Sequence, residues 1–155
     1  MIKICFVCHG NICRSPMAEF VMKALVKKAS RADEFHIESR ATHTDEIWNG
    51  IGSHIYPPAE QMLRKKHIPY DADKRAELLT REEYGNFDYF IGMDKENLRS
   101  MQRIFGGDKS NKIRLLLDFD GGGSVADPWY SRNFELAYSD ILRGCKEMLS
   151  TLRKE

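Results

Sequence analysis

Short apolar runs alternate along the chain with longer segments whose apolar residues have helical spacing. Four runs predict strands, at residues 2–7, 35–40, 87–93 and 112–117. Three of these runs are nearly continuous rather than alternating, as is typical of parallel strands buried on both faces. The run at 35–40 is more polar, which favours a place at the edge of the sheet.

The segments between these strands carry helix signals. Ser15 is a good N-cap and Pro16 suits the first helical position, which predicts a helix from there to about Lys28. Asp94 predicts the start of another helix, which reaches about Ile104. The remaining helices are expected at about 57–67, 74–84 and 133–152.

This alternation of strands and helices predicts an α/β protein, a doubly wound sandwich with right-handed crossovers. The length of 155 residues suits one domain, spanning 1–155. In such sheets ligands bind beyond the carboxyl ends of the strands. The first run ends at Val7-Cys8, and Cys5, Cys8 and Cys13 all lie near that point. We therefore expect the chemistry there.

The composition narrows the choice of partners and compartment. The formal net charge is +1, which gives no electrostatic case for nucleic acid or an anionic membrane as the main partner. No apolar run approaches the roughly 18 residues that a spanning helix needs. The apolar start is short and interrupted, unlike a signal peptide. We expect a cytoplasmic chain with reduced thiols, and the sequence predicts no oligomeric state.

The segment 8–15 combines a cysteine with the features of an anion site. Gly10 and Asn11 are the residue types that most easily adopt left-handed backbone angles, as a tight turn requires. Backbone N–H groups at a helix start bind anions, and Arg14 offers a planar fork of donors for phosphate oxygens. The same surroundings favour the thiolate form of Cys8, to which Ser15 can donate a hydrogen bond.

Three segments, at 7–19, 93–98 and 127–130, resemble the low-molecular-weight protein tyrosine phosphatase family. The first contains Cys-x5-Arg-Ser, and the last contains an Asp-Pro pair. The resemblance implies a three-layer sandwich, with a four-stranded parallel sheet and helices on both faces. It also implies a phosphatase that hydrolyses phosphotyrosine monoesters through a phosphocysteine. Cys8 would be the nucleophile, Arg14 the phosphate clamp and Asp127 the general acid.

The resemblance extends to the phosphate-binding loop and its surroundings. Cys13 would be a redox partner that protects the nucleophile, although packing against the first helix is an alternative. Two aromatic residues in a polar loop, Trp129 and Tyr130, suggest a substrate rim, with Trp48 as a possible opposite wall. No cofactor or metal is required. The loop residues expected to bind phosphate are His9, Gly10, Asn11, Ile12, Cys13, Arg14 and Ser15.

Two departures from the family pattern affect the expected rim rather than the chemistry. Residues 55–58 are Ile-Tyr-Pro-Pro where the family usually has an Asp-x-Arg helix entry, and the loop 120–124 is unusually rich in glycine. The expected partner is a phosphotyrosine protein or a small aryl phosphate.

Other interpretations of the cysteines stay open. Residues 5–9 match a c-type haem attachment pattern, and Cys5 with Cys8 could be a redox dithiol. Cys5, Cys8, Cys13 and His9 could bind zinc, but a second ligand pair is missing. An arsenate reductase would share the loop but needs cysteines between Cys13 and Cys145, where there are none. A phosphopeptide-binding module could do without Asp127.

Overall fold

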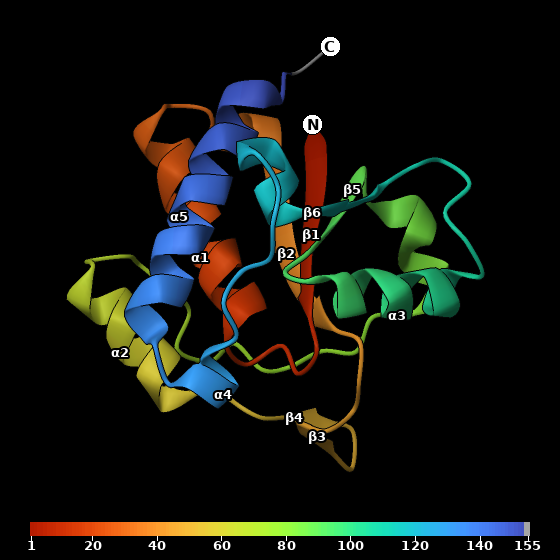
Figure 1. The fold of residues 1–155 in the computed structure, drawn as a ribbon, viewed down its shortest axis with the longest axis horizontal. Helices are drawn as coiled ribbons and strands as arrows, with labels where there is room; N and C mark the ends of the chain where they lie inside the picture. The colour runs from red at the N-terminus through yellow and green to blue at the C-terminus, as the bar shows by residue number, and fades with distance from the viewer. Residues whose placement is uncertain (154–155) are drawn as a thin grey trace.

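A computed structural model describes residues 1–153, so residues 154–155 of the expected domain lie outside the described part. The described chain forms a four-stranded sheet in the order β2-β1-β5-β6, and all three pairings are parallel (Figure 1). β2 lies at an edge, as its polar sequence predicts. The strands are β1 (Ile2–Cys8), β2 (Phe35–Ala41), β5 (Tyr89–Gly92) and β6 (Ile113–Leu115).

Helices cover both faces of this sheet, which confirms the expected fold class. α1 and α5 lie together on one face, and α3 lies on the other (Figure 1). The helices are α1 (Arg14–Lys28), α2 (Pro57–Lys65), α3 (Lys95–Phe105), α4 (Pro128–Ser131) and α5 (Phe134–Thr151). Three short 3-10 helices are η1 (Ala32–Glu34), η2 (Arg81–Asn86) and η3 (Leu116–Asp120). Within residues 1–153, no helix is long and apolar enough to cross a membrane.

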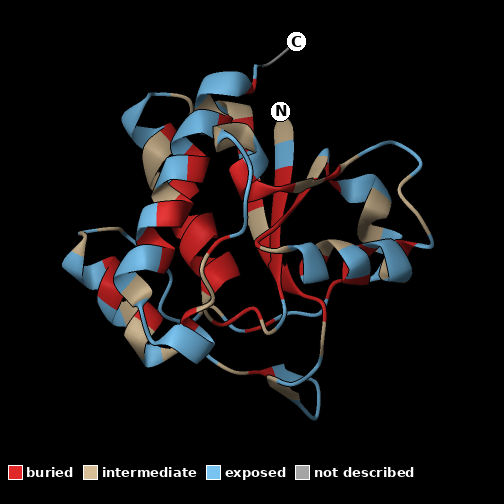
Figure 2. Ribbon diagram, viewed as in Figure 1, coloured by how far each residue is buried: buried red, intermediate tan, exposed pale blue. Residues whose placement is uncertain are grey.

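The central strand β1 supplies both halves of the core because its side chains alternate between the two faces. Ile4, Phe6 and Cys8 pack on the side of α1 and α5, whereas Cys5 and Val7 pack on the side of α3. Figure 2 shows the buried residues along β1 and on the inward sides of α1 and α5. A rigid strand buried on both faces therefore ends at Cys8.

The helix expected at about 74–84 is wrong. Its first half is extended, and Leu78 forms a parallel bridge with Ala41 at the end of β2. The Ala41 N–H donates to the Glu77 carbonyl at 2.7 Å, and the Leu79 N–H donates to the Ala41 carbonyl at 2.8 Å. Pairing with β2 thus takes the backbone groups that a helix would have used. The chain becomes helical only after Thr80, which caps the 3-10 helix η2.

Other element boundaries differ from the expected ones. α1 is capped at Cys13, so the expectation of Ser15 as N-cap is wrong and Ser15 lies in the first turn. β5 and β6 are shorter than the apolar runs that predicted them, and β6 ends at Leu115 because residues 116–120 form η3. The hydrophobic pattern also did not reveal a two-stranded hairpin, β3 (Ile47–Trp48) with β4 (Ile51–Gly52).

Candidate active site

The loop between β1 and α1 is held in place by the side chain of Asn11. Its φ angle is 59°, so Asn11 adopts the left-handed conformation expected for this turn. The Asn11 side chain is buried and donates to Ser15 Oγ at 2.8 Å, while its Oδ1 accepts from the Glu77 N–H at 3.0 Å. Asn11 therefore links the loop to the backbone of Glu77 and fixes its position.

Cys8 lies at the floor of this loop, with its residue only 4% exposed. Its Sγ is 3.0 Å from Ser15 Oγ and 3.4 Å from the Ser15 backbone nitrogen. The N–H belongs to the first turn of α1, where unpaired N–H groups carry partial positive charge. The serine that the sequence suggested as a helix cap instead contacts the sulfur through its hydroxyl and its backbone nitrogen.

Arg14 is buried beside Cys8 and held by three oxygen atoms. Its guanidinium contacts Asp94 Oδ2 at 2.9 Å, donates to the Val125 carbonyl at 3.1 Å and lies 3.5 Å from Asp127 Oδ2. Burial opposes the charge of Arg14. The negative charges of the Cys8 thiolate and the two carboxylates outweigh burial and raise the pKa of Arg14. Arg14 is thus a fixed cation.

Asp94 is the functional residue that the sequence analysis missed. The sequence predicted it only as a helix cap, and it has that role, because its Oδ1 accepts from the Asn97 N–H at 2.9 Å. Its other oxygen holds Arg14. Asp94 follows β5, the strand next to β1, so its place beyond a carboxyl end was the signal available in the sequence.

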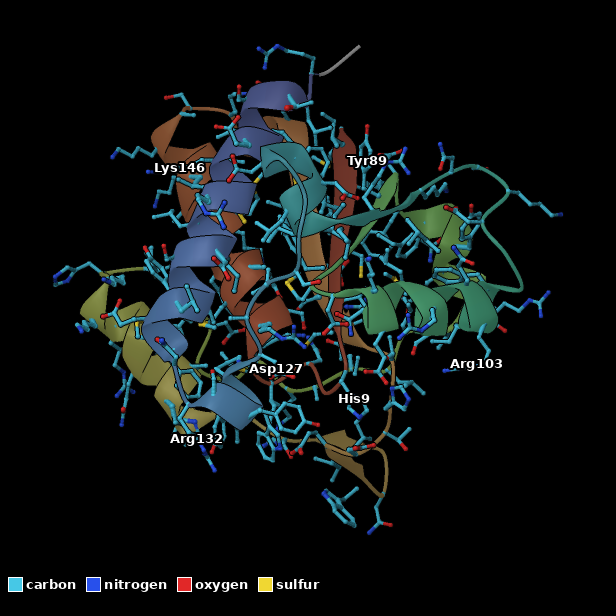
Figure 3. The ribbon with its side chains drawn as sticks, viewed as in Figure 1. His9, Tyr89, Arg103, Asp127, Arg132 and Lys146 are labelled. Atoms are coloured by element: carbon cyan, nitrogen blue, oxygen red, sulfur yellow. The ribbon has the colours of Figure 1, made fainter. Side chains whose placement is uncertain are left out.

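Asp127 also combines two roles at the start of a helix. Its Oδ1 accepts from the Trp129 N–H at 3.0 Å, which caps α4, and its Oδ2 faces Arg14. The Asp127 side chain is 35% exposed, so a carboxyl group there reaches both solvent and the pocket. Figure 3 shows Asp127 and His9 at the same end of the molecule.

A pocket of about 340 Å³ opens above these residues. It is lined by Cys8, Arg14 and Asp127, and the two aromatic residues expected at the rim, Trp129 and Tyr130, also line it. The other lining residues include His9, Gly10, Ile12, Cys13, Thr42, Asp45, Glu46, Asp94 and Glu96. Asn11 and Ser15, also expected to bind phosphate, are buried and are not among the lining residues.

Trp48 does not complete the rim. It belongs to the β3–β4 hairpin, is 73% exposed and is absent from the pocket lining. Asp45 and Glu46, from the same connection, line the pocket instead. The structure therefore does not place Trp48 opposite Trp129.

Comparisons with known proteins agree on one family. A family model described as low molecular weight phosphotyrosine protein phosphatase matches residues 3–155. The chain belongs to this family. A Bacillus subtilis low molecular weight protein-tyrosine-phosphatase, YfkJ, is 34% identical, and the alignment covers 100% of this chain and 98% of that protein. A low molecular weight phosphotyrosine protein phosphatase from Rattus norvegicus is 38% identical, covering 94% of this chain and 92% of that one.

Solved structures agree with this assignment. The crystal structure of SP-PTP, a low molecular weight protein tyrosine phosphatase from Streptococcus pyogenes, superposes with a TM-score of 0.88 at 40% identity. The superposition covers 100% of this chain and 95% of the Streptococcus pyogenes chain. The family, the fold and the enzyme class expected from the sequence are therefore confirmed. The chain is a cysteine-dependent protein tyrosine phosphatase.

One histidine, His9, lines this phosphatase pocket, and a second, His43, stacks on it. The rings of His9 and His43 stack with their centroids 4.0 Å apart, and His9 Nε2 lies 2.9 Å from Asp45 Oδ2. Burial and the neighbouring His9 lower the pKa of His43. The hydrogen bond with His9 lowers the pKa of Asp45. His9 thus ties the phosphate loop to the connection that carries Asp45.

The cysteines differ in their surroundings. All four are free, and burial raises the pKa of Cys5, Cys13 and Cys145. Cys5 and Cys8 belong to opposite faces of β1, which does not favour a redox pair between them. In residues 1–153, no three His, Cys, Asp or Glu side chains are grouped so that they could hold a metal ion.

Proposed function

We propose that Cys8, Arg14 and Asp127 carry out the phosphotyrosine hydrolysis that is typical of this family. One observation supports the proposal most strongly. The Cys8 sulfur, the Arg14 guanidinium and the Asp127 carboxyl line one pocket, and the sulfur lies beside the first turn of α1. An ionised nucleophile, a donor for phosphate oxygens and a proton donor therefore face the same volume.

In the first step, the Cys8 thiolate attacks phosphorus in line with the phenolic oxygen. The S–P bond forms as the P–O bond to the phenol breaks, and Asp127 transfers its proton to the leaving phenolate. Charge in the transition state lies on the equatorial phosphoryl oxygens. The loop N–H groups and Arg14 are already oriented to stabilise that charge, so little reorganisation is needed.

In the second step, water hydrolyses the phosphocysteine. Asp127, now a carboxylate, takes a proton from the attacking water. The new P–O bond forms as the S–P bond breaks, which releases inorganic phosphate and restores the thiolate. General acid–base help of this kind contributes roughly 10²–10⁴-fold to the rate. The position of Asp127 at the edge of the pocket, partly exposed, suits a group that exchanges a proton with water.

The proposed substrate is phosphotyrosine within a protein. The nucleophile lies at the floor of the loop, so a phosphate must reach down to it, which a phenyl ring permits and a serine side chain does not. Trp129 and Tyr130 provide aromatic surface beside that path. We expect higher catalytic efficiency on phosphotyrosine than on matched phosphoserine peptides. A cytoplasmic location stays a prediction.

Replacement of Cys8 tests the assignment. Cys8→Ser should abolish turnover of p-nitrophenyl phosphate but keep binding of inorganic phosphate, measured by calorimetry, because the loop and Arg14 hold the anion. The matched control is Cys145→Ala in the core beside α1, which should keep turnover. Substantial turnover by Cys8→Ser would overturn the nucleophile assignment. Loss of both turnover and phosphate binding would overturn the assignment of the loop as the anion site.

A further inference from the structure

A largely buried lysine lies behind the phosphate loop. Lys74 closes a turn just before the segment that pairs with the end of β2, and its side chain is only 10% exposed. Its Nζ donates to Asn11 Oδ1 at 3.2 Å and to the Ser39 carbonyl at 3.4 Å. Its carboxylate neighbour, Glu77, is 3.8 Å away on a side chain that is 57% exposed. Most of this charge therefore faces the loop.

A chain of hydrogen bonds connects Lys74 through Asn11 and Ser15 to the nucleophile. Lys74 donates to the Asn11 carbonyl oxygen, and the Asn11 amide donates to Ser15 Oγ at 2.8 Å. Ser15 Oγ lies 3.0 Å from Cys8 Sγ, and because a thiolate can only accept, the Ser15 hydroxyl donates to the sulfur when Cys8 is ionised. A cation on an amide oxygen makes the amide N–H a better donor, and bonds in such a chain strengthen one another.

We propose that Lys74 is a positioning residue that polarises the hydrogen bond between Asn11 and Ser15 and thereby favours the thiolate form of the nucleophile. The proposal rests on Cys8 being that nucleophile, as proposed above. It assigns to the lysine charge a role in the reaction, although Lys74 does not line the substrate pocket.

Lys74 is not the only group that holds Asn11 in place. Asn11 Oδ1 also accepts from the Glu77 N–H at 3.0 Å, and this backbone contact does not depend on the lysine. Loss of the ammonium group should therefore leave Asn11 in place while removing the charge. Lys74→Met is the suitable change because methionine keeps an apolar stem of similar length in this buried position.

Other charged groups also act on the sulfur and must stay constant in the test. Arg14 lies on α1 and favours the thiolate, while Asp94 and Asp127 approach from the starts of α3 and α4. Cys13 lies on the loop itself. Glu77, the carboxylate beside the lysine, is retained in every variant. A change confined to Lys74 therefore alters only the charge at the far end of the chain of hydrogen bonds.

The experiment measures how fast iodoacetamide alkylates Cys8 as a function of pH, with the modified peptide identified by mass spectrometry. Burial raises the pKa of the three other thiols, so alkylation in the acid range reports on Cys8. Lys74→Met should move the acid limb to higher pH by roughly half to one unit, a three- to tenfold slower alkylation below the midpoint. Lys74→Arg should stay closer to the parent.

Two controls show whether the effect travels through the proposed route. Lys146→Met removes an exposed lysine on α5, away from the end where His9 and Asp127 lie (Figure 3), and should leave the profile unchanged. In a Ser15→Ala background the chain of hydrogen bonds is broken, so Lys74→Met should then have little further effect.

The proposal is overturned if Lys74→Met leaves the profile of a folded protein unchanged. It is also overturned if Lys74→Arg shifts the limb as far as Lys74→Met, or if the shift persists in the Ser15→Ala background. Alkylation requires no turnover. A failure of the phosphatase assignment, seen as activity in Cys8→Ser, is therefore distinguishable from a failure of this inference.

Discussion

Asp127→Asn is the change that best separates the chemistry of the acid from its structural role. The carboxyl group caps α4 through Oδ1 and faces Arg14 through Oδ2. Asparagine and aspartate are about equally good N-caps, so the substitution keeps the contact with the Trp129 N–H. It replaces the carboxyl group, which can give a proton to a leaving group, with an amide, which cannot.

The expected loss depends on the substrate. For phenyl phosphates with poor leaving groups we expect kcat to fall roughly 10²–10⁴-fold, equivalent to about 3–5 kcal/mol of transition-state stabilisation. For strongly acidic phenols the loss should shrink, because a stable phenolate needs no proton. The free energy of unfolding should fall less in Asp127→Asn than in Asp127→Ala, since only the asparagine keeps the cap.

The assay measures kcat across a series of aryl phosphates and, separately, unfolding in denaturant. Asp127→Ala serves as the comparison, because it loses the acid and also the cap, at a cost of about 0.5–2 kcal/mol in stability. An equal loss of kcat across the whole series would refute the role of Asp127 as acid. So would near-normal activity in Asp127→Asn combined with inactivity in Asp127→Ala, which would show that only the cap matters.

Three further predictions concern the rim, the loop thiol and a distant carboxylate. Trp129→Ala should lower kcat/KM on phosphotyrosine peptides roughly two- to tenfold, the range of one aromatic contact, whereas Trp48→Ala outside the pocket should not. Equal losses would contradict this. Mild peroxide should inactivate the enzyme reversibly by a Cys8–Cys13 disulfide, seen by peptide mapping. Irreversible sulfinic acid alone would reject that pairing. Burial opposes ionisation of Asp108, but hydrogen bonds from a tyrosine hydroxyl and two backbone N–H groups lower its pKa. Stability from Asp108 is therefore present above its unfolded pKa and lost as pH falls, and Asp108→Asn should flatten that loss in unfolding measured against pH.

The sequence was most informative where one strong local rule applied. The continuous apolar run at the N-terminus predicted β1, because a strand buried on both faces has no polar side to show. Asp94 predicted the start of α3 correctly, since a cap is a local interaction, and the apolar spacing placed the start of α5 within one residue. Cys8, Arg14 and Asp127 were predicted as site residues from their motifs, and the fold brings all three to one pocket.

The sequence was least informative where tertiary contacts decided the backbone. Residues 74–80 have helical spacing, but their backbone pairs with β2 and with Asn11, groups more than thirty residues away. The same distance hid the partnership of Lys74 with Asn11 and of Asp94 with Arg14. Trp48 could not be placed either, because its hairpin directs it away from the pocket rather than into it.

The two carboxylates that face Arg14 occupy the same kind of position, which explains why both point at its guanidinium. Asp94 and Asp127 are each the N-cap of a helix that starts beside the pocket, α3 and α4. In both, Oδ1 is held by a backbone N–H of the helix, at 2.9 and 3.0 Å, so the direction of Oδ2 is set by the helix start. Oδ2 points at the guanidinium in each case. The difference between them is exposure, 26% for Asp94 against 35% for Asp127, and distance to Arg14, 2.9 Å against 3.5 Å. The shorter, more buried contact suits a permanent anchor for Arg14, whereas the longer, more exposed contact suits the acid role that we propose for Asp127.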